Sequence, residues 1–120
     1  MNTQEVANLW AKMCNENKLI ECAETLYANT IICKEMPGGT DAEITTGKQN
    51  VLNKSYQWLD TVETIHSCTV TTPVVAGNYF SSKMSFDVTF KDRGRIQMEE
   101  ICVFEVNNGQ IIFEQFFYTV

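Results

Sequence analysis

The second half of the chain constrains the fold most strongly. From residue 61 to residue 120, apolar and polar side chains alternate, which is typical of β-strands with one buried face. Three turn signals interrupt the alternation: Ala76-Gly77-Asn78, Asp92-Arg93-Gly94 and Asn107-Asn108-Gly109. The pattern predicts four long antiparallel strands that follow one another in a meander.

The first half has a different period, because its apolar residues recur at the spacing of amphipathic helices. A first helix is predicted after an N-cap at Asn2 or Thr3, with Val6, Leu9, Trp10, Met13 and Cys14 on its buried face. A second helix is predicted from Leu19 to Tyr27, and a third from Gly47 to Leu59. Between them we expect a short strand, Thr30–Cys33, and a surface loop, Met36–Glu43, whose Pro-Gly-Gly cannot continue a helix or strand. Helices followed by a sheet predict an α+β fold in which three N-terminal helices cover one face of a curved antiparallel sheet.

Composition limits the class of protein. The 120 residues are 44% hydrophobic, so we expect one domain over residues 1–120. The sequence has neither the start of a signal peptide nor a long apolar run, which predicts a soluble cytoplasmic protein without membrane contact. The net charge is -6 and the basic residues are scattered, so a nucleic-acid partner is not expected. The five cysteines form no C-x-x-C pair, and no nucleotide motif is present, so neither a metal nor a cofactor is predicted.

The register of the strands can be predicted from the turns. A three-residue loop with a bulge at Gly94 would place Phe86 opposite Glu100. A two-residue turn at Asn108-Gly109 would place Cys102 opposite Gln115 and Glu100 opposite Phe117. The helix-facing side of the sheet would then carry Glu100, Gln115 and Phe117 among apolar residues.

The same alternation, extended to the first long strand, places His66 and Cys68 on that face, although a slip of one residue would turn His66 outward. Burying the carboxylate of Glu100 is costly unless it has a partner, a proton or water. A cavity would provide these, so this face is predicted to line a pocket.

Glu100 is the candidate general acid or base, since an apolar pocket raises the pKa of a carboxyl group toward neutrality. His66 is the second catalytic candidate, acting with Glu100 or alone. Both have an alternative as structural residues. A set of aromatic and amide side chains is predicted either to bind the ligand or to fill an ordinary core: Trp10, Tyr27, Trp58, Phe86, Gln115 and Phe117. Glu35 and Asp41 flank the Pro-Gly-Gly loop, where they would reach the pocket mouth or be solvated.

The opposite face of the last hairpin is also apolar, although glutamates interrupt it. The predicted apolar set is Ile101, Val103, Ile112, Phe116 and Tyr118. A contiguous apolar set of this size on an exposed sheet marks a protein contact. We expect this face to form a homodimer interface.

The order of elements and the segment GRIQMEEICVFEVNNGQIIFEQFFY, residues 94–118, resemble the nuclear transport factor 2-like superfamily, and within it the polyketide-cyclase-like (SnoaL-like) branch. The resemblance implies a cone-shaped, strongly curved sheet wrapped around the helices and an internal cavity. It also implies a homodimer. The family's ketosteroid isomerases are not matched residue by residue: Trp10 takes the place of their tyrosine, Met36 precedes Pro37 where they have an aspartate, and Cys102 lies near their second aspartate.

Two functions follow as hypotheses. The first is a protein that binds an apolar or aromatic small molecule in the cone and carries out cofactor-free acid/base chemistry of the isomerase, cyclase or dehydratase kind. The second is a non-catalytic, dimeric binding or association module. An open cavity with Glu100 and His66 close together would favour the first, and an outward His66 or a filled cavity would favour the second.

Overall fold

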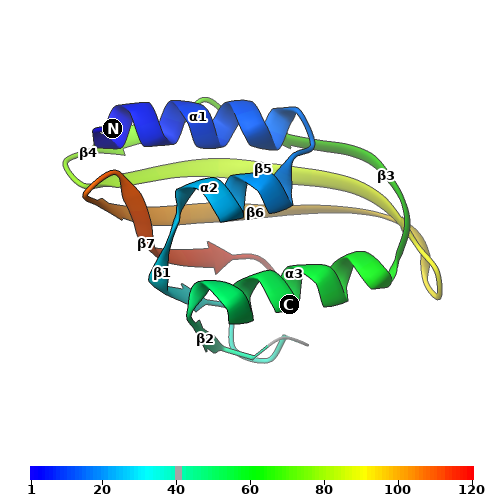
Figure 1. The fold of residues 1–120 in the computed structure, drawn as a ribbon. Helices are drawn as coiled ribbons and strands as arrows, with labels where there is room; N and C mark the ends of the chain where they lie inside the picture. The colour runs from blue at the N-terminus through cyan, green and yellow to red at the C-terminus, as the bar shows by residue number, and fades with distance from the viewer. Residues whose placement is uncertain (40–41) are drawn as a thin grey trace.

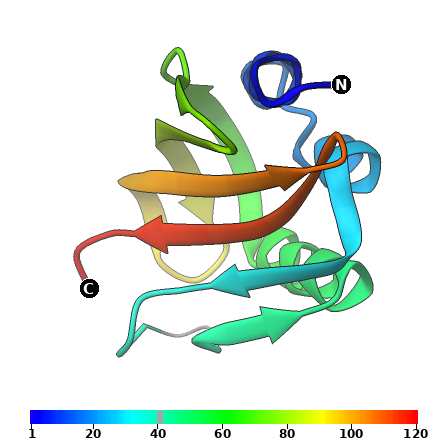
Figure 2. The same cartoon turned by 90° about the vertical axis from the view of Figure 1, so that its left-hand side faces the viewer.

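The computed structural model describes residues 1–39 and 42–120. It contains three helices, α1 (Thr3–Asn15), α2 (Leu19–Leu26) and α3 (Lys48–Asp60), and seven strands. The strands are β1 (Tyr27–Lys34), β2 (Ile44–Thr46), β3 (Val62–Val70), β4 (Val74–Ala76), β5 (Tyr79–Phe90), β6 (Gly94–Asn107) and β7 (Gln110–Phe117). All three helices lie on one side of the sheet (Figure 1), which is strongly curved (Figure 2). The predicted α+β architecture is confirmed.

The sheet is mixed and open, with the strand order β2-β1-β7-β6-β5-β3 and β4 paired to β5. The pair β1 and β7 is parallel, and the other pairs are antiparallel. The four predicted long strands correspond to β3, β5, β6 and β7. The short strands β2 and β4 were not predicted, and the predicted loop Met36–Glu43 includes residues 40–41, which lie outside the described residues.

Local sequence signals explain the ends of several elements. Asn2 caps α1, because its side-chain oxygen accepts a hydrogen bond of 2.8 Å from the backbone N–H of Glu5, whose carboxylate accepts one in return. Asn108 and Gly109 have φ angles of 51° and 74°, as a tight hairpin turn between β6 and β7 requires. The three predicted turns all separate strands in the structure.

The core lies between α1 and the concave side of the sheet. Its largest member, Trp10, is 2% exposed, and its ring centroid lies 4.8 Å from that of Phe104 and 5.5 Å from that of Phe80. Phe80 and Phe104 stack on each other across the pair of β5 and β6. This aromatic cluster fixes α1 on the sheet and closes one end of the space between the layers.

None of the helices in the described ranges combines the length and the hydrophobicity needed to cross a membrane.

Candidate functional site

A pocket of about 610 Å³ lies between the concave face of the sheet and the three helices. This size falls within the range of roughly 300–1,000 Å³ that is usual for small-molecule sites. Its wall is rich in aromatic side chains, which come from both layers: Trp10, Tyr27, Trp58, Phe86, Phe90, Phe104, Phe116 and Tyr118. The pocket therefore has the apolar lining that a ligand site requires.

Four carboxyl groups line the described pocket; that of Glu99 is exposed, and the other three are at least half-buried. Glu35 follows the last residue of β1, Glu100 lies in the middle of β6, and Glu114 lies on β7. The lysine in the wall is Lys54, which α3 directs into the pocket one helical turn before Trp58. Carboxyl groups collected in an apolar space affect one another's proton affinity, and the hydrogen-bond and ion-pair partners of each group change it further.

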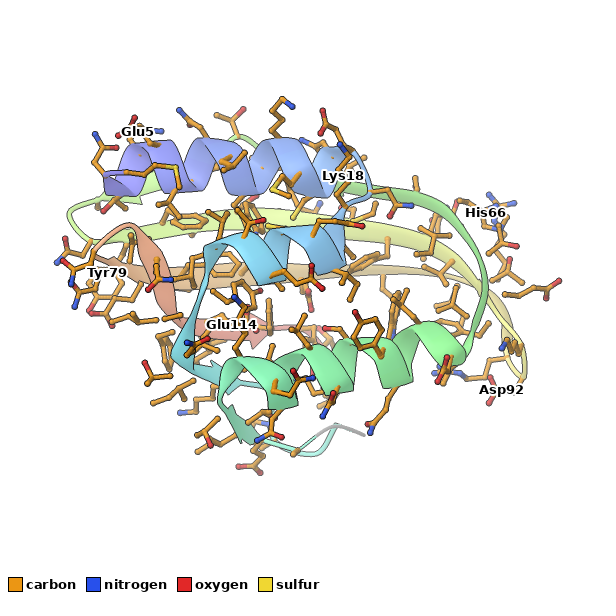
Figure 3. All side chains as sticks on the ribbon, in the orientation of Figure 1. Glu5, Lys18, His66, Tyr79, Asp92 and Glu114 are labelled. Atoms are coloured by element: carbon orange, nitrogen blue, oxygen red, sulfur yellow. The ribbon has the colours of Figure 1, made fainter. Side chains whose placement is uncertain are left out.

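Glu114 is 2% exposed and lies between the sheet and the helices, as its label in Figure 3 shows. The hydroxyl of Tyr27 donates a hydrogen bond to its carboxyl group. Burial raises the pKa of Glu114 from 4.5 to about 7, and the neighbouring Glu35 adds to the increase, whereas Tyr27, Cys33 and Lys54 oppose it. Near neutral pH, the protonated and ionised forms of this group are therefore both populated.

Glu100 is half-buried and has a similarly raised pKa. Burial is again the main cause, and the charges of Glu35 and Glu114 add to it, so the pKa of Glu100 rises from 4.5 to about 7. Its contact with the thiol of Cys102, at 3.9 Å between sulfur and oxygen, opposes the shift. Glu100 is thus able to give or accept a proton near neutral pH.

Glu35 is buried and forms an ion pair. Its carboxylate lies 3.0 Å from the ammonium group of Lys54 and accepts a second hydrogen bond, of 2.8 Å, from the hydroxyl of Tyr118. Burial acts to lower the pKa of Lys54, but Cys33 and Glu35 more than offset it, so this pKa is raised and the ammonium stays charged. Of the two alternatives expected for Glu35, contact with the pocket agrees with the structure and a solvated position does not. Asp41 lies outside the described residues.

Five of the eight predicted catalytic or ligand-binding residues line the pocket. These are Glu100, Trp10, Tyr27, Trp58 and Phe86. His66, Gln115 and Phe117 do not line it, and in each case the predicted facing is wrong.

His66 faces outward because a β-bulge interrupts β3. Ile65 pairs with Val88, but Ser67 pairs with Asp87, so one extra residue lies between these pairs and the alternation shifts. The His66 ring is exposed and its Nε2 lies 2.7 Å from the hydroxyl of Thr89. Figure 3 shows it at the edge of the molecule, away from Glu114, and it does not line the pocket with Glu100.

A second bulge reverses the facing of β7. Val106 pairs with Ile111 as the turn predicted, but Glu105 pairs with Phe113, which leaves Ile112 as the extra residue. Beyond this point every side chain points to the face opposite to the predicted one. Gln115 and Phe117 therefore lie on the outer face, opposite Val103 and Ile101.

The same bulge brings Glu114 and Phe116 inward, and Tyr118 also lines the pocket. Phe116 packs edge-on against Phe104 at a centroid distance of 6.3 Å, and Tyr118 bonds to Glu35. Their predicted place in an outer interface is wrong for this reason.

Two of the missed residues had a signal in the sequence. Ile31, Cys33 and Glu35 continue a period of two, which indicates that Glu35 shares the inward face of β1. Lys54 lies three residues after Val51 and four before Trp58, on the apolar stripe of α3. Glu114 had no such signal, because the bulge at Ile112 cannot be read from the alternation.

Within residues 1–39 and 42–120, no group of three or more His, Cys, Asp or Glu side chains has an arrangement that could hold a metal ion. The polar groups that line the described pocket include carboxyl, ammonium, guanidinium, phenol, hydroxyl, amide and thiol groups. Such groups can transfer protons and form hydrogen bonds.

Comparison with known proteins identifies the family. The model of the SnoaL-like domain matches residues 1–118. A crystal structure from Mesorhizobium loti, provisionally described as a SnoaL-like polyketide cyclase, is 31% identical, with 98% of this chain and 100% of that chain covered and a TM-score of 0.91. No protein of curated function matches the chain.

More distant structures share the fold. An NTF2-like protein of unknown function from Burkholderia pseudomallei is 10% identical, with 99% and 92% of the two chains covered and a TM-score of 0.80. A protein with a ketosteroid isomerase-like fold from Catenulispora acidiphila, solved in complex with trimethylamine, is 18% identical, with 99% and 88% covered and a TM-score of 0.73. The chain belongs to the SnoaL-like domain family and has the nuclear transport factor 2-like fold.

Proposed function

We propose that the protein binds an apolar or aromatic small molecule in the pocket and carries out acid/base chemistry on it without a cofactor. Glu100 is the proposed acid or base. The observation that carries the proposal is the half-buried carboxyl group of Glu100 in an aromatic wall, with a pKa raised to about 7. A group with this pKa exchanges protons efficiently at neutral pH, as isomerase, cyclase and dehydratase reactions require.

The surroundings of Glu100 support this role. Glu35 is already paired with Lys54, and Glu114 is held by Tyr27, so both have fixed partners. Within the described part of the chain, the side chain of Glu100 makes only the long contact with Cys102, which leaves its oxygens available to a ligand. We assign no catalytic role to His66. The similarity to a protein described as a polyketide cyclase agrees with chemistry of this class.

Replacing Glu100 by Gln should abolish base catalysis in the pocket. A suitable probe is 5-nitrobenzisoxazole, an aromatic compound whose carbon-bound proton is removed by a base while its N–O bond breaks, releasing a coloured phenolate. The wild-type rate should rise with pH through about 7, as Glu100 loses its proton. The Glu100→Gln variant should be slower by on the order of 100-fold, since general-base catalysis contributes that much.

Glu105→Gln is the matched control, because this residue lies on the same strand between the inward-facing Phe104 and Val106. It should keep the wild-type rate. Equal rates for wild type and Glu100→Gln, or a wild-type rate that does not change near pH 7, would rule out Glu100 as the base.

We propose further that the outer face of the sheet forms a homodimer interface, which is also the basis of the alternative function as an association module. The apolar residues that support it are Ile101, which is 46% exposed, Phe117, which is 42% exposed and pairs with Ile101, and Tyr79, which is 51% exposed. Val103 lies on the same side of β6. Exposed apolar side chains grouped on one sheet face are typical of a protein contact.

Phe117→Arg should convert a dimer into a monomer, because it places a charge within the proposed interface. Light scattering should give twice the 13.7 kDa chain mass for the wild type and a single chain mass for the variant. Tyr56→Arg is the control, since Tyr56 is equally exposed, at 45%, but lies on α3. A wild-type protein that is already monomeric would contradict the interface.

A further inference from the structure

The negative and positive charges of the groups that line the pocket are not equal in number. The carboxylate of Glu35 is neutralised by Lys54, at 3.0 Å. Among the described residues, neither Glu100 nor Glu114 forms an ion pair, and the charge of Lys54 only partly opposes the rise in their pKa values. The pocket therefore has more negative than positive groups whenever either of these two carboxyl groups is ionised.

The remaining titratable groups do not restore the balance. Arg93 and Glu99 also belong to the wall, but their side chains are exposed: Arg93 stacks on the ring of Phe90, with its guanidinium carbon 4.0 Å from the centroid, and Glu99 pairs with Lys83 at 3.0 Å. An exposed cation at the rim is screened by water and contributes little inside.

The neutral groups around the two carboxyls stay neutral at cellular pH. Burial raises the pKa of the Cys33, Cys68 and Cys102 thiols, and that of Cys68 reaches about 11. Burial also raises the pKa of the Tyr27 hydroxyl, with a further contribution from Glu114. These groups can donate hydrogen bonds but supply no positive charge.

We infer that the ligand of this pocket carries a positive charge, as a small amine or quaternary ammonium group attached to an apolar or aromatic body. The inference rests on the proposed small-molecule binding and names the class of compound. A cation would supply the positive charge that Glu100 and Glu114 lack. An anionic ligand would add a like charge to an apolar pocket that already holds ionised carboxyl groups and is disfavoured.

The aromatic wall favours the same class. Trp10 and Trp58 stand on α1 and α3, on the helix side, and Phe86, Phe104 and Phe116 stand on the sheet side. A cation near the face of such rings is attracted by their π electrons, and the attraction is strongest for tryptophan and when water is excluded. The rings also cover the apolar body, so the two parts of the ligand are recognised by the same cavity.

A permanent cation does not change its own charge with pH, so any pH dependence of its binding must come from groups of the protein. The pKa values of Glu100 and Glu114, both about 7, mean that the two groups ionise as pH rises from 6 to 8. A quaternary ammonium compound should therefore bind more tightly at the higher pH. A neutral compound of the same shape should bind more weakly there or show no change, because it gains nothing from the new charges.

The test uses three aromatic probes of nearly equal size: phenyltrimethylammonium, the neutral tert-butylbenzene, in which carbon replaces the charged nitrogen, and 4-tert-butylbenzoate, which is an anion. Binding is followed by the fluorescence of Trp10 and Trp58 and by chemical shifts, at about pH 5.5 and about pH 8. At the higher pH the ammonium probe should bind at least about tenfold more tightly than tert-butylbenzene, and the benzoate should bind weakest.

Substitution of the two carboxyl groups tests whether they are the groups that attract the ammonium probe. Glu100→Gln and Glu114→Gln should each weaken the ammonium probe by about tenfold and change the affinity of tert-butylbenzene by less than about twofold. Glu105→Gln on the outer face should change neither. Binding of tert-butylbenzene as tight as that of the ammonium probe at both pH values would overturn the cationic class and leave the proposed apolar pocket in place. Failure of all three probes to bind would overturn both.

Discussion

The free energy of unfolding of the Glu114→Gln variant, taken relative to that of the wild type, should be higher at about pH 8 than at about pH 4.5. The reason is the difference between the folded pKa of Glu114, about 7, and its ordinary value of 4.5. Below pH 4.5 the carboxyl group is protonated in both states. Between pH 4.5 and 7 the unfolded chain releases the proton while the folded protein keeps it, so the free energy of unfolding falls as pH rises.

A shift of this size corresponds to roughly 3 kcal/mol for one group. Gln has the shape of the acid but no charge, and its carbonyl oxygen can still accept the hydrogen bond from Tyr27. The difference in free energy of unfolding between variant and wild type should therefore move by up to that amount in favour of the variant from pH 4.5 to pH 8. Urea unfolding at several pH values gives this difference directly.

In the Glu114→Gln variant the free energy of unfolding should still decrease somewhat as pH rises, because Glu100 also has a pKa of about 7. In the double variant with Glu100→Gln, this free energy should depend on pH even less. Two parallel curves for wild type and Glu114→Gln between pH 4.5 and 8 would show that Glu114 has no raised pKa in the folded protein.

Trp10→Ala should lower the free energy of unfolding by about 3–5 kcal/mol, which is the usual cost of removing a large buried aromatic side chain. Trp10 is 2% exposed and contacts the rings of Phe80 and Phe104, so its loss would leave a cavity between α1 and the sheet. A change of this size is a large fraction of the stability of a typical small domain. Thermal and urea unfolding should both show it.

Trp58→Ala is the matched comparison, since it removes the same side chain from a half-buried position. Trp58 lies against Phe86 and Phe90, with centroid distances of 5.5 and 6.0 Å, on the wall of the pocket. Its loss should cost less than the loss of Trp10 and should reduce binding of an aromatic probe. Equal costs for the two substitutions would contradict the assignment of Trp10 to the core.

Local sequence signals were sufficient for much of the fold. The capping box of Asn2 and Glu5 determines where α1 begins, and Asn108-Gly109 determines where β6 turns back into β7. The register between β5 and β6 was predicted two residues away from the observed one: Phe90 pairs with Gly94, and Glu100 pairs with Met84. An error of two residues preserves the facing of every side chain, so Glu100 was still assigned to the inner face correctly.

Errors of one residue had a larger effect on the predicted site. The bulge in β3 moved His66 out of it, and the bulge at Ile112 exchanged Gln115 and Phe117 for Glu114 and Phe116. A bulge depends on how two strands and the layer beneath them fit together, and the alternating pattern in one strand does not reveal it. In each of these strands the alternation therefore predicted the facing on one side of the bulge only, as the buried Cys68 in β3 and Ile111 in β7 illustrate.

The sequence by itself determined the α+β order of elements, the positions of the turns, the family resemblance and the inward position of Glu100. The tertiary structure decided which other groups share the pocket with it. Glu35, Lys54 and Glu114 are separated by 19 and 60 residues along the chain, and only the parallel pairing of β1 with β7 and the packing of α3 bring them together. Their proton affinities depend on burial and on one another's charges, and both arise only when the chain has folded.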